Sequence, residues 1–181
     1  RRQRLLRHPR PSLVPAQDQV RVEKAIQIVE KFHDTPRTMY PGNYNRHPLR
    51  VARILLEEFS VTNGPAVIIA LCHDLGEWSE YDVAQLENEF GSEIKAGVDM
   101  LTWNVNDTWE TFFQNIIATG NDDLIKVKMA DKLDNNRAAL FSDKKHQEKA
   151  TEKTLSVVKP VVEKHFPQYW SKFEASLRPL L

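Results

Sequence analysis

The segment from Pro65 to Cys72 constrains this chain most, because it is apolar on every side and leads directly into His73 and Asp74. A helix that is hydrophobic all round runs through a protein core. A histidine beside an aspartate is costly to bury there unless both side chains have partners. A divalent cation can partner both, since imidazole and carboxylate together suit Mn²⁺, Fe²⁺ or Zn²⁺. Taken alone, the pair also fits a satisfied core histidine.

The rest of the chain has helical periodicity. From Asp18 onward, apolar residues recur mostly at three- and four-residue intervals, which is typical of amphipathic helices. Pro, Gly and Asn concentrate over 34–46 and predict a loop. No stretch of useful length alternates between apolar and polar residues. We therefore predict an all-α helical bundle forming a single domain over 18–181, preceded by a poorly ordered basic tail over 1–17.

The last part of the chain gives two structural interpretations. The segment from Lys144 to Leu181 predicts one or two helices, interrupted near Pro160 and Pro167. Within it, the charged run over 142–149 is most simply a solvated helix face.

Composition narrows the classes of function. Lysine and arginine number 25, as do aspartate and glutamate, so the net charge is zero. This balance gives no electrostatic footprint for duplex nucleic acid or an anionic membrane. No apolar run is long enough to span a bilayer. A single cysteine, Cys72, excludes an internal disulfide and fits a reducing compartment, so we expect a cytoplasmic location. The sequence leaves the oligomeric state open.

Two further residues can complete a site with the His-Asp pair. His47 stands directly before a proline, where a helix is expected to begin. Asp131 and Asn135 share one stripe of the helix predicted over 122–140, flanked by apolar residues. This stripe indicates a polar pocket, although neighbouring lysines leave a solvated helix face open. Asp134, three residues after Asp131, is a rival for the same role.

The order His…His-Asp…Asp on an all-α chain resembles the HD superfamily of metal-dependent phosphohydrolases. Within it, the chain is most similar to the hydrolase domain of RelA/SpoT-type guanosine-polyphosphate proteins. The segments that carry this resemblance, in the family's order, are 46–52 (RHPLRVA), 70–77 (ALCHDLGE), 86–91, 97–98 and 125–137. The resemblance extends from about Ala25 to Leu140, and four such motifs in the right order are far more specific than any one of them.

The resemblance implies an HD-domain helical bundle, one bound divalent ion and a nucleotide substrate. Mn²⁺ is the foremost candidate ion, with Fe²⁺ and Zn²⁺ as alternatives. The implied metal ligands are His47, His73, Asp74 and Asp131. Glu77 is expected to position or deprotonate the attacking water. The residues expected to bind the substrate are Arg37, Tyr44, Arg46, Lys132 and Asn135. The implied reaction removes pyrophosphate from the 3′ position of a nucleotide such as ppGpp. Arg50 is a further candidate for holding the phosphate chain.

Two departures from the family pattern keep other functions open. Trp78 replaces the second acid of the family's Glu-Asp pair, so that Glu80 or Asp82 supplies the missing carboxylate or the activity is low or redirected. Asp134 replaces a histidine before the asparagine. The alternatives are another HD nucleotidase or phosphodiesterase with a different nucleotide substrate, and a catalytically weak regulatory module that binds metal and nucleotide.

Overall fold

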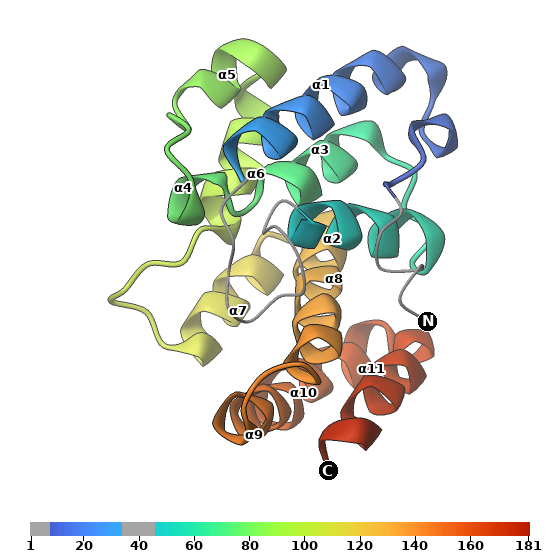
Figure 1. Cartoon of the computed structure of the whole chain (residues 1–181), viewed down its shortest axis with the longest axis vertical. Coiled ribbons are helices and arrows are strands. Elements are labelled where there is room, and N and C mark those ends of the chain that lie inside the picture. Colours follow the sequence, from blue (N-terminus) through green and yellow to red (C-terminus); the bar gives the residue numbers. More distant parts are fainter. Residues whose placement is uncertain (1–7, 34–45) are drawn as a thin grey trace.

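The computed structural model describes residues 8–33 and 46–181, and helices without strands make up its regular structure in these ranges (Figure 1). The prediction of an all-α fold is confirmed. The α-helices of the described part are α1 (Ala16–Phe32), α2 (Arg46–Glu57), α3 (Gly64–Cys72), α4 (Leu75–Trp78), α5 (Gln85–Phe90), α6 (Ser92–Leu101), α7 (Trp109–Ala118), α8 (Asp122–Ala139), α9 (Lys144–Lys153), α10 (Lys159–His165) and α11 (Trp170–Leu177). Three-residue 3₁₀ helices span Pro11–Leu13, Pro167–Tyr169 and Arg178–Leu180, and a π-helical turn spans Thr154–Val158.

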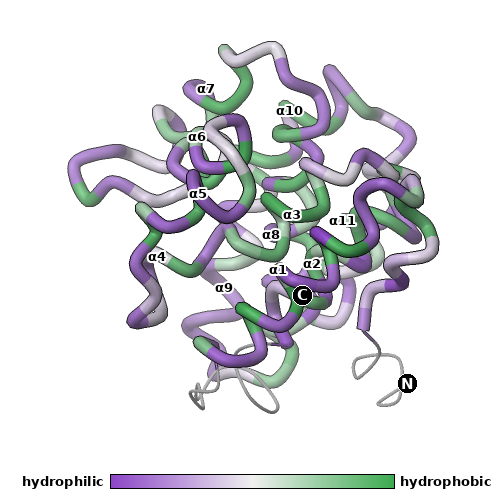
Figure 2. The backbone as a smooth tube through the Cα atoms, turned by 90° about the horizontal axis from the view of Figure 1, so that it is seen from above, coloured by the Kyte–Doolittle hydropathy of each residue, from purple (hydrophilic) through white to green (hydrophobic). Residues whose placement is uncertain are grey.

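Helix α3 is the central element. It contacts α1, α2, α6 and α8, and its tube is largely hydrophobic where it passes between the surrounding helices (Figures 1 and 2). The Asn63 side chain caps it by accepting a hydrogen bond from the amide of Ala66, and Pro65 stands in its first turn. Gly97 of α6 allows close packing, because a Cβ there would lie 2.4 Å from Cδ1 of Ile69. These contacts bury α3 on all sides and fix where its C-terminal end lies.

Helices α2 and α8 pack against each other and against α3. Glu58, just after α2, forms a bidentate pair with Arg137 of α8, with oxygen–nitrogen distances of 2.6 and 2.9 Å. Lys172 of α11 lies 3.5 Å from the same carboxylate. Three elements distant in sequence are therefore joined at one carboxylate.

The described ends of the chain differ from the sequence interpretation. Helix α1 begins at Ala16, and Val14 is 3% exposed in the core, so packed structure begins before Asp18. Residues 1–7 lie outside the described part. Near the other end, the chain remains helical through Pro160, and the π turn ends at Val158, two residues before this proline. Proline lacks the amide hydrogen of a regular helix, and a π turn accommodates such a fault without ending the helix.

Across the described residues, we find no helix with the length and apolar character needed to cross a membrane.

Replacing Ile68 by alanine tests the role of α3. The side chain of Ile68 is 0% exposed, so its truncation leaves a cavity and lowers the free energy of unfolding by about 2–5 kcal/mol. Urea denaturation measures this change. The matched control is Val20→Ala on α1, where the side chain is 74% exposed and the expected change is close to zero. Equal losses in the two variants would contradict the central position of α3.

The Glu58 carboxylate predicts a pH-dependent contribution to stability. Burial opposes its ionisation, but Arg137 and Lys172 outweigh burial and lower the pKa of Glu58 from 4.5. A lowered folded pKa means that the stabilisation is present above the unfolded pKa and lost as the pH falls through the folded pKa. We expect Glu58→Gln to cost about 1 kcal/mol at pH 7. Urea denaturation at pH 7 and at a pH below the ordinary value of 4.5 should show the smaller cost at the lower pH. An equal cost at both pH values would contradict this assignment.

Candidate metal centre

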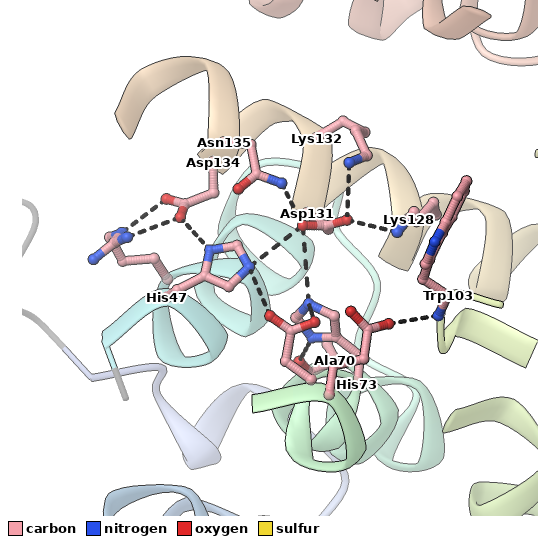
Figure 3. A network of polar contacts seen from close by, with 12 residues as sticks. His47, Ala70, His73, Trp103, Lys128, Asp131, Lys132, Asp134 and Asn135 are labelled. Carbon is pink, nitrogen blue, oxygen red and sulfur yellow. Dashed lines mark hydrogen bonds and ion pairs between the residues drawn. The ribbon is translucent and has the colours of Figure 1, made fainter. Parts of the chain in front are cut away.

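Helices α2 and α8 and the junction between α3 and α4 bring the four predicted metal ligands together, and Figure 3 labels three of them, His47, His73 and Asp131. His47 lies in the first turn of α2, and Asp131 lies in the middle of α8. His73 follows the last residue of α3, and Asp74 precedes the first residue of α4. The central position of α3 therefore places the His-Asp pair between α2 and α8.

The ligand atoms of these residues lie close to one another. One nitrogen each from His47 and His73 and one oxygen from Asp74 lie within 4.8 Å of one another. Nε2 of His47 is 3.6 Å from Oδ2 of Asp74 and 3.3 Å from Oδ1 of Asp131. Nε2 of His73 is 3.3 Å from Oδ1 of Asp74 and 3.9 Å from Oδ1 of Asp131. Both Nε2 atoms thus lie near two carboxylates, in an arrangement of two imidazoles and two acids.

His47 is held in one orientation by Asp134. Its Nδ1 lies 2.7 Å from Oδ2 of Asp134, so the Nδ1 hydrogen is donated to this carboxylate and Nε2 carries the lone pair. Burial opposes protonation of His47, but the hydrogen bonds and charges of Asp131 and Asp134 outweigh it and raise its pKa above 6.5. The carboxylates that favour a proton at Nε2 equally favour a metal cation there.

Asp134 also holds Arg50. Nε and Nη2 of Arg50 donate to its two oxygens at 2.8 and 2.9 Å, and both side chains are buried. Burial opposes ionisation of Asp134, but Arg50 and His47 outweigh it and lower its pKa. The expectation that Arg50 holds a phosphate chain stays a prediction, and the buried ion pair at Nε and Nη2 argues against it.

His73 has the features of a neutral ligand. Its Nδ1 donates to the backbone oxygen of Ala70 at 2.7 Å, and burial lowers its pKa to about 3. Its Nε2 is buried without a hydrogen-bond partner. A buried unpaired acceptor is costly, and a bound cation at this atom would satisfy it. Both histidines thus donate Nδ1–H to an oxygen acceptor and keep Nε2 for another bond, as metal-bound histidines ordinarily do.

Asp131 joins the cluster to three polar side chains of α8. Its Oδ2 is 2.9 Å from Nζ of Lys128 and 3.7 Å from Nζ of Lys132, and its Oδ1 accepts a hydrogen bond from Asn135 at 2.7 Å. Burial opposes ionisation of Asp131, but the lysines and His47 outweigh it and hold its pKa well below 3.8. Asp131 is thus ionised and fixed, and its Oδ1 lies on the side of the two histidines (Figure 3).

Glu77, the predicted catalytic acid, lies on α4, one turn beyond Asp74. Its Oε1 accepts a hydrogen bond from the backbone amide of Trp103 at 2.5 Å, which fixes the carboxylate. Trp78 is 50% exposed. The sequence departure at this position therefore places a large, partly exposed indole next to Glu77.

The predicted substrate residues fall into two groups. Lys132 and Asn135 lie beside Asp131, and Arg46 is half-buried at the start of α2. Arg37 and Tyr44 lie outside the described residues. Sequence reasoning missed the roles of Asp134 and Lys128, both buried next to predicted ligands. They lie three residues after and before Asp131, a spacing that places side chains on the same face of a helix. This spacing was the signal in the sequence that could have identified them.

The Asp134–Arg50 pair predicts a large loss of stability when one partner is removed. Asp134→Asn leaves the buried guanidinium without a counter-charge, and we expect a loss of about 3–5 kcal/mol in the free energy of unfolding. The double variant Arg50→Met/Asp134→Asn removes that charge while an amide oxygen still accepts from His47, so most of the loss should be recovered. Urea denaturation compares the two variants. A double variant no more stable than the single one would contradict the ion-pair interpretation.

The known proteins that are similar to this chain have names that refer to GTP or ppGpp. The chain matches no protein-family model. The GTP pyrophosphokinases of Streptomyces antibioticus and Streptomyces coelicolor are each 30% identical over 148 residues, which covers 77% of this chain. The match spans 17% of the length of these two relatives. A probable GTP pyrophosphokinase of Mycobacterium leprae is also 30% identical over 148 residues.

A solved structure extends the likeness to the fold. It belongs to a metazoan orthologue of SpoT described as hydrolysing ppGpp, with a TM-score of 0.58 and 25% identity, and the match covers 66% of this chain and 70% of that one. The resemblance predicted from the motifs is therefore confirmed: the chain has the all-helical HD-domain fold and is a relative of the RelA/SpoT-type proteins.

Proposed function

We propose that this chain is a metal-dependent phosphohydrolase that removes the 3′-pyrophosphate of a guanosine polyphosphate such as ppGpp. The observation that carries the proposal is the geometry of the two buried histidines. Each gives its Nδ1 hydrogen to an oxygen acceptor and turns Nε2 toward the carboxylates of Asp74 and Asp131. A histidine that only fills a core has no need of this arrangement.

The donor set fits a divalent cation. His47, His73, Asp74 and Asp131 would hold the ion, and mixed nitrogen and oxygen ligands suit Mn²⁺, Fe²⁺ or Zn²⁺. When bound, such an ion lowers the pKa of coordinated water from about 15.7 toward 7 and attracts phosphate oxygens. Lys128 and Lys132 both pair with Asp131 and offset its negative charge.

The side chains around the cluster have separate tasks in this proposal. Glu77 is held at Oε1 by the amide of Trp103, and its Oε2 accepts the proton of the attacking water. Lys132 and Arg46 supply positive charge to the phosphate chain. Asn135, adjacent to Asp131, contacts the nucleoside sugar. The family resemblance alone assigns Arg37 and Tyr44 to the base, and both lie outside the described residues.

The pyrophosphokinase names of the curated relatives do not oppose hydrolysis. The match spans 17% of the length of the Streptomyces proteins, so their names describe much longer chains. The metazoan orthologue that hydrolyses ppGpp matches over 70% of its chain. A cluster of histidines and acids around a cation also suits water activation for hydrolysis.

Trp78 favours a second candidate function. An exposed indole stands where the family has its second acid, and it changes both the charge and the shape beside Glu77. This change suits an HD nucleotidase acting on a different nucleotide. A panel of nucleotides assayed beside ppGpp separates the two substrates, and bound metal without any turnover would favour the regulatory module instead.

The variant Asp74→Asn tests the metal centre. The Asp74 side chain is 14% exposed and the amide has the same shape, so we expect the fold to survive while the ligand charge is lost. Pyrophosphate release from ppGpp with Mn²⁺ should fall by more than about 100-fold. Mutation of a residue that only orients a metal ligand already lowers metal affinity or activity by about 10–100-fold. Elemental analysis of the purified variant should show a matching loss of Mn²⁺.

The matched control is Asp99→Asn on α6, where a half-exposed carboxylate pairs with Lys95 away from the cluster. It should keep both its metal and its activity. Metal binding and pyrophosphate release that persist in Asp74→Asn would contradict the proposed site.

A further inference from the structure

Trp103 makes two kinds of contact, one through its backbone and one through its ring. It lies in the segment that joins α6 to α7, and its backbone amide donates to Oε1 of Glu77 at 2.5 Å. Its ring is half-buried and packs against the hydrophobic core. A hydrogen bond from an amide to a charged acceptor is about twice as strong as one between neutral groups. The position of the Trp103 ring therefore bears on the position of the proposed base.

The Trp103 ring belongs to an aromatic cluster that consists of Trp103, Trp109 and Phe112. The centres of the Trp103 and Trp109 rings are 4.9 Å apart, and their planes are inclined by 31°. The Phe112 ring meets the Trp103 ring edge to face, with 5.4 Å between the centres. Both separations lie in the range of about 4.5–7 Å at which aromatic pairs attract one another. Because Trp109 and Phe112 belong to α7 and Phe112 is 3% exposed, the aromatic cluster joins Trp103 to a buried helix face.

Helix α8 places the aromatic cluster next to the metal centre. Nζ of Lys128 lies 4.8 Å from the centre of the Phe112 ring and 5.6 Å from that of Trp109. The same ammonium is 2.9 Å from Oδ2 of Asp131. A cation over an aromatic face is attracted by the ring. The aromatic cluster thus contacts a partner of a proposed metal ligand, and Figure 3 shows Lys128 and Trp103 on the same side of Asp131.

The Trp103 ring also anchors a segment that is otherwise exposed. Residues 104–106 are all exposed. The backbone amides of Asn106 and Asp107 both donate to Asn104, so these hydrogen bonds stay within the segment. A segment with exposed residues and local hydrogen bonds has low local stability. Loss of the Trp103 ring would therefore loosen the backbone amide that contacts the proposed base.

The carboxylate of Glu77 needs an anchor of this kind. Helix α4 is four residues long, and a glutamate side chain turns about several bonds beyond the backbone. A general base works only within hydrogen-bond reach of the proton that it removes. A misplacement of about 1 Å can lower a rate by about 100-fold. The amide of Trp103 engages Oε1 and thereby gives Oε2 one direction.

We propose that Trp103 is a positioning residue for the hydrolysis, because its ring holds its own backbone amide where the amide orients Glu77. The inference rests on the proposed function and makes it more specific by adding a residue that acts through the base. Trp103 needs no contact with the substrate or with the ion for this role. Its effect falls on the transition state, in which the base takes the proton, and not on binding of the nucleotide.

The variant Trp103→Ala tests the ring, since alanine removes the ring and keeps the backbone amide. We expect kcat for ppGpp to fall about tenfold with KM unchanged, because a misplaced base weakens only the transition state. The content of bound Mn²⁺ should stay the same. Trp103→Phe keeps a ring in the aromatic cluster and should recover most of the lost kcat. An increase in KM with kcat unchanged would overturn the proposal and make the ring part of the substrate site.

Trp170→Ala on α11 is the matched control. Trp170 is also half-buried, it stacks on Phe173, and Nζ of Lys159 lies 5.2 Å from the centre of its ring. Helix α11 lies on the opposite side of the molecule from α4 (Figures 1 and 2), so kcat should stay as in the wild type. Thermal melting measures the stability that each variant loses. An equal loss of kcat in Trp170→Ala and Trp103→Ala would overturn the proposal, since both would then act through stability alone.

Glu77→Gln shows whether Trp103 acts through the base. This variant should lower kcat by about 100-fold or more, which is the contribution of a general base. If Trp103 acts only through Glu77, Trp103→Ala should lower kcat no further in the Glu77→Gln background. A second loss of the same size in that background would overturn the proposal, because the two residues would then act independently.

A measurement without catalysis separates this inference from the proposed function. The amide proton at position 103 lies in a short hydrogen bond to a carboxylate, so its nuclear magnetic resonance signal should lie downfield of most other amides. The signal should move upfield in Glu77→Gln and in Trp103→Ala but not in Trp170→Ala. These shifts without hydrolysis of any nucleotide would overturn the proposed function and support the positioning. Hydrolysis by the wild type, with the signal unmoved in Trp103→Ala, would overturn the positioning and leave the proposed function intact.

Discussion

The arrangement of α2 and α8 depends on a buried group of charges in which Asp134 accepts hydrogen bonds from both Arg50 and His47. Removing these charges from water carries a desolvation cost, which is offset only because both carboxylate oxygens are engaged at 2.7–2.9 Å. The geometry leaves little freedom for His47. Since His47 and Asp131 reach across the same helix pair, the position of the candidate metal centre follows from this contact and from the depth at which α3 ends.

The zero net charge of the chain conceals two strongly charged regions that lie next to each other. Carboxylates dominate around the histidines, and lysines dominate around the basic cavity, with α8 contributing to both. The basic cavity has a volume of about 200 Å³, and the lysines that line it are Lys132, Lys149 and Lys153. Asp131 lies at the boundary, because Asn135 and Lys132, which contact its carboxylate, also line the basic cavity. A region that attracts a cation thus borders a region that attracts anions, and the overall charge carries no information about either.

Much of the fold and of the metal cluster could be predicted from sequence because their signals are local. The apolar run of α3 requires burial, and the His-Asp pair at its end is conspicuous for that reason. Asp134, by contrast, looked like a rival to Asp131, since three residues along a helix only say that both share a face. Its partners Arg50 and His47 are 84 and 87 residues away in the sequence. The periodicity of one helix does not show which residue of another helix it contacts. The run over 142–149 is exposed over most of its length, as expected for a solvated helix face, and only Ser142, His146 and Lys149 of it line a cavity where α9 packs on α8.

The π turn before Pro160 has a consequence for how the basic cavity could change. A π turn amounts to one residue inserted into an α-helix, and each residue of an α-helix advances it by about 100°. The lysine-bearing face of α9 and the core-facing Val161 and Val162 of α10 are thus set in register by a single extra residue. A chain one residue shorter here would keep α10 in the core and rotate Lys149 and Lys153 away from α8. Two of the three lysines that line the cavity would then leave it, with every proposed metal ligand left in place.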